Sequence, residues 1–320
     1  MLKRRLGRSD IEVSALGMGC WTIGGPWYFI DHEAGWGQVD DQESIRAIQC
    51  ALDLGVTFFD TAAVYGCGHS ERVQGQALAG RREQAVIASK FGFAIDEKHR
   101  FAKHHDDVLR NIRKECEASL RRLNTDHIDL YQFHIGGYDP QKAGEVCEIL
   151  DELVTEGKIR WYGWSTDNPE GARIFAQGTH CTAIQHLMNI ANDSPAILAV
   201  CDKFHLASIN RVPLGGGLLT GKYTSTSEFT KDDIRSTWNL NESRYTKRLK
   251  HIDALRQLLT QDGRTLAQAA LAWLWGRSQR SIPIPGFRNE AQVRENVKAV
   301  EYPMLSAEQM KRIEELFGRK

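Results

Sequence analysis

Short runs of β-branched and aromatic residues alternate with longer helical patterns along the whole chain of 320 residues. Such alternation is typical of parallel strands joined by crossover helices, because a tight hairpin cannot connect two parallel strands. The strand-like segments lie at residues 14–20, 56–60, 85–90, 128–134, 159–165, 183–186, 207–211 and 282–285. The helical patterns include those at 41–55, 106–123, 140–157, 169–177 and 265–276. The sequence therefore predicts an α/β fold with a parallel sheet.

The number of strand-like segments favours a (β/α)₈ TIM barrel over a doubly wound open sheet. No linker or change of composition divides the chain, so we expect a single domain over residues 1–320. No G-x-G-x-x-G motif follows an early strand, which argues against a Rossmann fold, and the glycines at 215–217 have the wrong spacing. The opening segment LKRRLGRSDIEV is expected to form a small hairpin at the floor of the barrel.

Charge and cysteine usage exclude several classes of partner. Lys and Arg together number 41, as do Asp and Glu, so nothing electrostatic favours nucleic acid or an anionic membrane surface. The 7 cysteines are scattered without C-x-x-C spacing, which favours free thiols in a reducing compartment over a metal site. No segment resembles a secretory signal or a membrane span. We expect a cytoplasmic protein that binds a small molecule, with no metal, nucleic acid or membrane partner.

Polar and ionisable side chains end several of the predicted strands, where the reacting groups of a barrel belong. In chain order these residues are Asp60, Lys90, His134, Ser165 and Gln185. Tyr65 follows in the loop after the strand that Asp60 ends. Each residue alone has a structural explanation, such as a buried ion pair or a packed ring. Their joint occurrence indicates a site, because it is costly to gather polar groups at a partly desolvated centre.

These residues and the motifs around them resemble the aldo-keto reductase superfamily, in its bacterial branch, over essentially the full chain. The matching segments are FFDTAAVYG at 58–66, ASKFG at 88–92, YQFH at 131–134, PLGGGLLTGKY at 213–223 and IPGFRNEAQVRENV at 284–297. The resemblance implies a (β/α)₈ barrel with additional C-terminal helices and NAD(P)H-dependent reduction of a small carbonyl compound. It also implies a catalytic tetrad of Asp60, Tyr65, Lys90 and His134.

Elementary chemistry gives each member of this tetrad a role. Hydride delivery to a carbonyl builds an alkoxide, which needs a proton as it forms. Tyr65 would be the general acid, and a Lys90 ammonium beside it would stabilise the phenolate that remains. Asp60 would keep Lys90 charged and hold its flexible stem. His134 would offer a second hydrogen bond to the carbonyl oxygen and orient the substrate.

The resemblance assigns the cofactor to further residues. Ser165, Thr166 and Gln185 match the carboxamide-binding positions, although relatives usually have Asn in place of Thr166. Arg211 stands where many relatives place an aromatic ring against the nicotinamide, and the alternative is that it pairs with a local carboxylate. The segment expected near the ribose is Gly19, Cys20 and Trp21. The pyrophosphate loop is expected to comprise Pro213, Leu214, Gly215, Gly216 and Lys222.

The adenosine signature follows the last predicted strand and consists of Gly286, Arg288, Gln292, Glu295 and Asn296. A helix that begins near Asn289 would present its amino terminus to a phosphate. Arg288 lies just before this helix and suits a 2′-phosphate, because a guanidinium can bind a phosphate with two hydrogen bonds. We therefore expect NADP(H) in preference to NAD(H), which stays possible.

The substrate pocket is expected to have apolar walls formed by Trp21, Trp27, Tyr28, Phe91 and Ile135. The insertion at 24–41 is expected to rim this pocket. The polar stretch at 224–246 has no periodicity and would either fold over the cofactor or be disordered.

Two other functions remain open at this point. A barrel lyase would use Lys90 as a Schiff base, although Asp60 opposes nucleophilic attack by keeping the amine protonated. A regulatory subunit would keep the fold and the cofactor with little turnover, as channel-associated members of the superfamily do. An intact tetrad argues against this second alternative.

Overall fold

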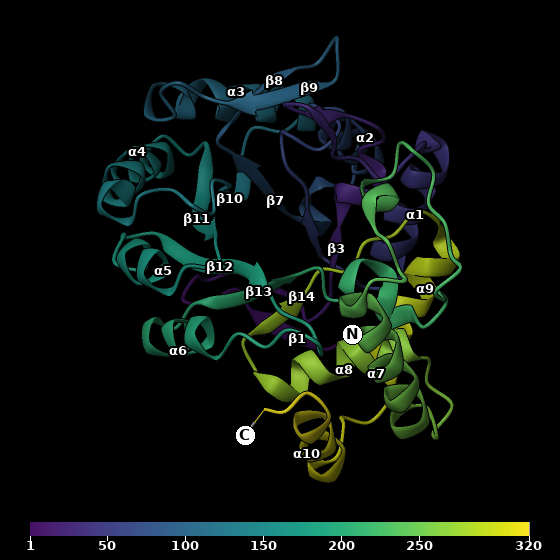
Figure 1. Cartoon of the computed structure of the whole chain (residues 1–320). Helices are drawn as coiled ribbons and strands as arrows, with labels where there is room; N and C mark the ends of the chain where they lie inside the picture. Colours follow the sequence, from purple (N-terminus) through teal and green to yellow (C-terminus); the bar gives the residue numbers. More distant parts are fainter. Residues whose placement is uncertain (320) are drawn as a thin grey trace.

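The computed structural model of the chain describes residues 1–319. Its centre is a barrel of eight parallel strands in the spatial order β3-β6-β7-β10-β11-β12-β13-β14 (Figure 1). The strands are β3 Gly17–Gly19, β6 Phe58–Asp60, β7 Val86–Phe91, β10 Ile128–Phe133, β11 Ile159–Ser165, β12 Cys181–Leu187, β13 Ala207–Arg211 and β14 Ser281–Pro283. Each lies within three residues of a predicted segment's bounds, so the predicted barrel is confirmed.

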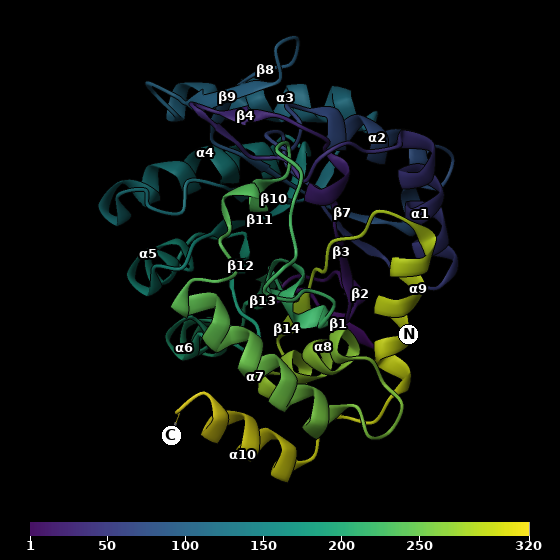
Figure 2. The ribbon, with the colours of Figure 1, turned by 45° about the vertical axis from the view of Figure 1, so that its right-hand side comes forward.

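Helices surround the barrel and connect its strands. The connecting helices are α1 Asp41–Asp53, α2 His69–Ala77, α3 Ile112–Leu123, α4 Ala143–Thr155, α5 Pro169–Phe175, α6 Pro195–Phe204, α7 Ser243–Leu259 and α8 Leu266–Arg277. After the last strand come α9 Glu290–Lys298 and α10 Ala307–Leu316, which are the expected additional C-terminal helices. Helix α9 packs against α1, and α10 packs against α7 (Figure 2).

The barrel closes between its first and last strands at two glycines. Gly19 N–H donates to the Pro285 carbonyl oxygen at 3.0 Å, and Gly19 forms a parallel bridge with Gly286. The backbones approach so closely that a Cβ at position 19 would lie 2.7 Å from the Ile284 carbonyl oxygen. Only glycine fits this seam without displacing backbone.

The N-terminal hairpin of β1 Lys3–Arg5 and β2 Glu12–Ser14 lies at the floor of the barrel, as predicted. It buries Leu6 and Val13 in one apolar cluster with Leu130, which lies inside the barrel. The floor is therefore sealed, and the opposite end of the barrel is left for a site.

A second, smaller sheet stands beside the carboxyl ends of the barrel strands. The insertion after β3 folds into β4 Tyr28–Phe29 and β5 His32–Glu33. The chain after β7 folds into β8 Phe93–Asp96 and β9 Phe101–His104. Parallel pairing of β4 with β9 joins the two hairpins into one sheet (Figure 2). The β8–β9 hairpin is not among the strands that the sequence predicts.

Residues 224–238, which we call the strap, cross the mouth of the barrel and dock on the insertion after β3. Ile234 N–H donates to the Gly35 carbonyl at 2.8 Å, and Gly37 N–H donates to the Asp232 carbonyl at 3.0 Å. The Arg235 guanidinium lies 4.8 Å from the centre of the Trp36 ring. The strap is thus ordered by a backbone bridge and a cation–π contact, against the alternative of disorder.

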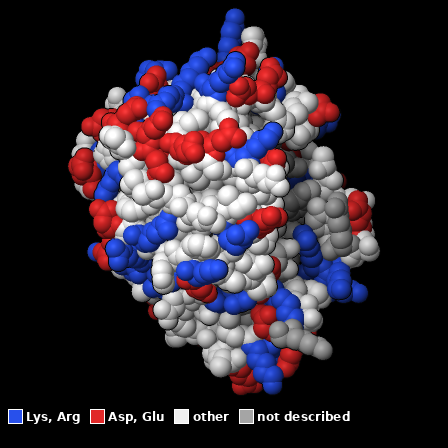
Figure 3. Space-filling view, turned by 90° about the vertical axis from the view of Figure 1, so that its left-hand side faces the viewer, with Lys and Arg blue, Asp and Glu red and all other residues white. Residues whose placement is uncertain are grey.

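Within residues 1–319, no helix is long and apolar enough to cross a membrane. On the face shown in Figure 3, basic and acidic side chains occur together. That face therefore lacks the uniformly basic surface by which nucleic-acid-binding domains are recognised.

Candidate active site

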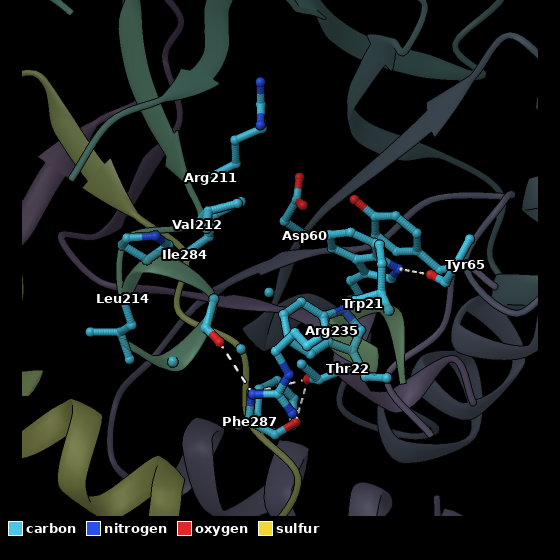
Figure 4. A pocket seen from close by; sticks show the side chains of 18 of the residues that line it. Trp21, Thr22, Asp60, Tyr65, Arg211, Val212, Leu214, Arg235, Ile284 and Phe287 are labelled. Carbon is cyan, nitrogen blue, oxygen red and sulfur yellow. Dashed lines mark hydrogen bonds between the residues drawn. The ribbon is translucent and has the colours of Figure 1, made fainter. Parts of the chain in front are cut away.

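A cavity of about 920 Å³ opens at the carboxyl ends of the barrel strands (Figure 4). The insertion after β3, the strap and the start of α9 complete its walls. It gathers the following residues singled out in the sequence: Gly19, Trp21, Trp27, Asp60, Tyr65, His134, Ser165, Thr166, Gln185, Arg211, Pro213, Leu214, Gly216, Lys222, Gly286, Arg288, Gln292, Glu295 and Asn296.

Lys90 lies directly beneath this cavity and is fully buried. Its Nζ donates to Asp60 Oδ2 at 2.6 Å, to the Thr61 carbonyl at 2.8 Å and to Tyr65 Oη at 3.1 Å. The three acceptors match the three ammonium protons, so the amine has a fixed orientation. The pairing of β6 with β7 brings Asp60 and Lys90 together at neighbouring strand ends.

The electrostatics of this cluster keep Lys90 charged and Tyr65 neutral. Burial acts to lower the pKa of Lys90, but the Asp60 carboxylate and Tyr65 outweigh burial and raise it above its ordinary value. Burial raises the pKa of Tyr65, and the Lys90 ammonium opposes this only in part. The expected tuning by Lys90 is therefore present, but it does not reverse the effect of burial. Tyr65 holds its proton at neutral pH and faces a permanent positive charge.

His134 lies just beyond β10, and its ring meets the Tyr65 ring edge-on at a centroid distance of 5.9 Å. Burial, followed by the positive charges of Lys90 and Arg211, holds the pKa of His134 well below its usual range. The imidazole is thus neutral, with one hydrogen-bond donor and one acceptor. It can orient a carbonyl oxygen near Tyr65, but it does not carry a charge.

Two glutamines bind the Asp60 carboxylate from inside the barrel. Gln132 Nε2 donates to Asp60 Oδ1 at 2.9 Å, and Gln185 Nε2 donates to the same oxygen at 2.8 Å. Gln185 is expected at the cofactor from the resemblance, whereas Gln132 is not among the predicted site residues. The available signal was a polar residue in the middle of an apolar strand, two positions before His134.

The adenosine segment forms a polar corner of the cavity. Asn289 caps α9 by accepting from Gln292 N–H at 3.0 Å, and Gln292 Oε1 accepts from Arg288 N–H at 2.8 Å. The Arg288 Nη2 atom is buried and has no hydrogen-bond partner in the described part of the chain. An orphaned guanidinium nitrogen beside a helix amino terminus suits a phosphate, so these residues fit an anionic cofactor.

The glycine-rich loop follows β13 and forms the 3₁₀ segment Gly215–Thr220. Gly215, Gly216 and Gly217 have φ values of 61°, 68° and 94°, a left-handed path that favours glycine. Gly216, Gly217 and Lys222 line the cavity, which suits the close approach of a pyrophosphate. Gly215 lies against Leu219 and is not among the residues that line the cavity, so its cofactor contact stays a prediction.

Several expected wall residues lie elsewhere. Tyr28 is 47% exposed on β4, and its neighbour Phe29 lines the cavity instead, because side chains alternate along a strand. Phe91 faces away from the barrel interior, which its neighbour Lys90 enters, and stacks on Tyr131 at 4.7 Å. The aromatic side chains that do line the cavity include Trp21, Trp27, Phe29, Trp36 and Phe93. Ile135 packs against the core and approaches Gly92, so it too is absent from these walls.

Two residues that were expected at the cofactor, Cys20 and Arg211, have surroundings that bear on this expectation. Cys20 is fully buried below the cavity, where burial raises its pKa, so only Gly19 and Trp21 of that segment reach the cavity. Arg211 does line the cavity, but its guanidinium forms an ion pair with Asp167. The alternative of pairing with a local carboxylate is therefore the one observed. Asp167 is itself held by Leu187 N–H at 2.7 Å.

The strap covers part of the cavity, because Ile234 and Arg235 belong to its wall. Arg235 donates to the Gly216 carbonyl at 3.2 Å and to Tyr223 Oη at 2.7 Å. The strap thus joins the glycine-rich loop, through Gly216, to the insertion after β3, through Trp36. Figure 4 shows the Arg235 side chain in this pocket.

Comparisons with known proteins agree with this geometry. The model of the family described as "Aldo/keto reductase family" matches residues 15–317. Aldo-keto reductase YhdN of Bacillus subtilis is 33% identical, covering 89% of this chain and 84% of its own length. NADH-specific methylglyoxal reductase of Escherichia coli is 33% identical, covering 96% of each chain.

Solved structures give the same result. A glycerol dehydrogenase from Gluconobacter oxydans superposes with a TM-score of 0.85 at 33% identity, covering 99% of this chain and 95% of its own. An aldo/keto reductase from Klebsiella pneumoniae, solved in complex with NADP and acetate, has a TM-score of 0.72 at 26% identity and covers 99% and 96% of the two chains.

Proposed function

Since this chain belongs to the aldo/keto reductase family, we propose that it reduces an aldehyde or ketone to an alcohol with NADPH, and that Tyr65 supplies the proton. One observation carries the proposal: Tyr65 Oη lies 3.1 Å from Lys90 Nζ, which is itself 2.6 Å from Asp60 Oδ2. This arrangement places a protonated phenol next to a permanent positive charge, at the wall of a cavity that fits a dinucleotide.

The bound cofactor supplies a hydride to the carbonyl carbon, and the chain's residues manage the proton and the charge. Tyr65 Oη donates a hydrogen bond to the carbonyl oxygen and transfers its proton as negative charge develops there. The Lys90 ammonium stabilises the phenolate that remains, and Asp60 keeps the ammonium charged. Neutral His134 donates a second hydrogen bond to the same oxygen. The same groups act in reverse for alcohol oxidation.

The adenosine corner favours NADPH over NADH. Arg288 Nη2 is a buried donor without a partner inside residues 1–319, and a 2′-phosphate would supply its acceptor. Among relatives, an aldo-keto reductase of Schizosaccharomyces pombe carries NADP(+) in its name, whereas the E. coli methylglyoxal reductase is named as NADH-specific. We therefore expect this chain to use NADPH in preference to NADH.

The rival functions fit the geometry less well. A Schiff-base lyase needs a neutral amine, but all three protons of Lys90 are engaged by acceptors, and its pKa is raised mainly by Asp60 against the effect of burial. A relative from Arabidopsis thaliana, 29% identical, is named a probable voltage-gated potassium channel subunit beta. A regulatory role of that kind does not require the complete proton-donating cluster that this chain retains.

Two measurements test the proposal. NADPH oxidation should be followed on a panel of neutral aliphatic and aromatic aldehydes, with the alcohol product identified. We expect aldehyde-dependent oxidation, because the aromatic walls suit an uncharged substrate. Borohydride treatment with the same aldehydes should leave Lys90 unmodified. Failure of every carbonyl compound to promote NADPH oxidation would refute the reductase, and a reduced adduct on Lys90 would favour the lyase.

A further inference from the structure

Gln132 and Gln185 form a buried amide pair behind the proton donor. Gln132 lies on β10 and Gln185 on β12, and both side chains are inside the barrel with at most 1% exposure. Their Nε2 atoms lie 2.9 Å and 2.8 Å from the same oxygen of Asp60. Asp60 Oδ2 accepts from Lys90, so this carboxylate is bound by donors on both oxygens.

The charge of Asp60 determines how the two amides are turned. A carboxylate only accepts hydrogen bonds, so each glutamine must direct its NH₂ group, not its oxygen, toward Asp60. Gln185 Nε2 also lies 3.2 Å from Gln132 Oε1, which accepts its second proton. Both protons of Gln185 are thus engaged inside the barrel, and its oxygen is left for the cavity that Gln185 lines.

The other titratable groups around Asp60 and Tyr65 are few. Cys20 from the segment after β3 has a pKa raised chiefly by burial, and His134 has a pKa lowered chiefly by burial, so both are neutral near neutral pH. Arg211 at the end of β13 is positive, and its ion pair with Asp167 offsets that charge. The Asp60 carboxylate and the Lys90 ammonium therefore dominate the field at Tyr65.

We propose that Gln132 is a positioning residue of this reductase: it fixes the Gln185 amide with its oxygen toward the cavity and holds Asp60 against Lys90. The inference rests on the proposed function, because it acts through Tyr65 and through the cofactor contact of Gln185. Without Gln132, the Gln185 amide loses the acceptor that sets its orientation. The Gln185 oxygen, which would accept a hydrogen bond from the cofactor carboxamide, then no longer has a fixed position. Asp60 also loses the hydrogen bond from Gln132 Nε2 that holds it beside Lys90.

Gln132→Met tests the proposal, because methionine has a similar length and makes no amide hydrogen bonds. We expect the affinity for NADPH, measured by fluorescence titration, to fall about fivefold, the factor that one net hydrogen bond of about 1 kcal/mol is worth. We also expect kcat to fall by at least about tenfold and its alkaline limb to move to higher pH, because the Tyr65 phenolate is less stabilised.

Gln74→Met is the matched control. Gln74 on α2 is also fully buried, but its amide atoms have no hydrogen-bond partner among the residues described. Its replacement should leave NADPH affinity and the pH profile unchanged. If Gln132→Met matches Gln74→Met in both measurements, the proposal is wrong.

Gln132→Glu gives an independent test that also serves if the methionine variant does not fold. A protonated carboxyl group can donate to Asp60 as the amide does, whereas an ionised one repels it. Burial and the neighbouring Asp60 carboxylate raise the pKa of the new group, so we expect activity relative to wild type to be highest near about pH 5 and to be lost toward about pH 9 as the group ionises. A constant ratio to wild type across this range would overturn the proposal.

The result is separable from the proposed function itself. If Tyr65→Phe retains full activity, the reductase mechanism fails. If Tyr65→Phe is inactive while Gln132→Met keeps wild-type affinity and pH dependence, only the role of Gln132 fails.

Discussion

Replacing Tyr65 by phenylalanine removes the proposed proton donor and leaves the shape of the site nearly unchanged. Tyr65 is only 9% exposed, and its ring stacks on Trp21 at 5.8 Å, a contact that phenylalanine retains. The change removes Oη and with it one of three acceptors of Lys90, while Asp60 and the Thr61 carbonyl keep the ammonium in place. We therefore expect a loss of folding stability near the lower end of the ~1.5–3 kcal/mol found for hydrogen bonds to charged groups.

The effect on the chemical step should be larger. General acid catalysis contributes about 10²–10⁴-fold, which corresponds to roughly 3–5 kcal/mol of barrier. Stopped-flow measurement of NADPH oxidation with saturating aldehyde reports this step directly. The rate constant for Tyr65→Phe should fall by that factor, while NADPH affinity stays within about twofold of wild type, because the substitution leaves the adenosine corner untouched.

Tyr131→Phe is the control for this experiment. Tyr131 is fully buried on β10 in the same barrel, and its hydroxyl has no hydrogen-bond partner within the described residues. Removing it should leave the rate unchanged and raise stability by up to about 1–3 kcal/mol, the cost of a buried unpaired polar group. A Tyr65→Phe rate within about threefold of wild type would refute the assignment of the acid, as would an equal loss in Tyr131→Phe.

Three further predictions concern the cofactor, acid stability and the thiols. Arg288→Ala should weaken NADPH binding at least about tenfold and leave NADH binding nearly unchanged; equal losses in fluorescence titration would contradict the 2′-phosphate contact. Burial lowers the pKa of His186 from 6.5 to about 4, so the stability it contributes is present above pH 6.5 and is lost as the pH falls toward 4. Between about pH 8 and pH 5 the free energy of unfolding should fall by about 2 kcal/mol because of His186. In His186→Gln this part of the fall should be absent, and an identical pH dependence of unfolding in both proteins would disprove the prediction. Burial also raises the pKa of Cys67 to about 12, and each cysteine in the described chain is buried, so iodoacetamide should label the native protein only after denaturation, and rapid labelling would argue against this burial.

The barrel could be predicted because most residues of its strands are buried on both faces, so that the strands read as mainly apolar runs. All six residues of β10 are buried, and so are five of the six in β7. For the same reason the sequence does not show which side chains point into the barrel, because apolar and polar residues do not alternate along such a strand. The sequence therefore places Phe91 among the predicted pocket residues, although Lys90 occupies the inward position.

The clustering of Asp60, Tyr65, Lys90 and His134 could be predicted because strand ends converge in a barrel whatever the details of packing. The aromatic walls of the cavity depend instead on an irregular insertion and on its pairing with a distant hairpin. The parallel contact of β4 with β9 decides that Phe29 faces the cavity and Tyr28 faces solvent. The orientation of the Gln185 amide likewise depends on Asp60 of β6 and Gln132 of β10. These residues are distant in the sequence, so the local pattern around Gln185 cannot predict it.

The glycine seam has a consequence for how the chain is made. Gly19 emerges from the ribosome early, but its partners Pro285 and Gly286 are translated only when most of the polypeptide already exists. Until then the incomplete barrel has an unpaired strand at each edge of its sheet, and unpaired strand edges can pair with other chains and aggregate. Arg288 lies two residues after Gly286, so the chain can close the barrel and bind a dinucleotide at almost the same stage of synthesis. NADPH binds only the closed barrel, so NADPH added during refolding should stabilise this form relative to its open precursors.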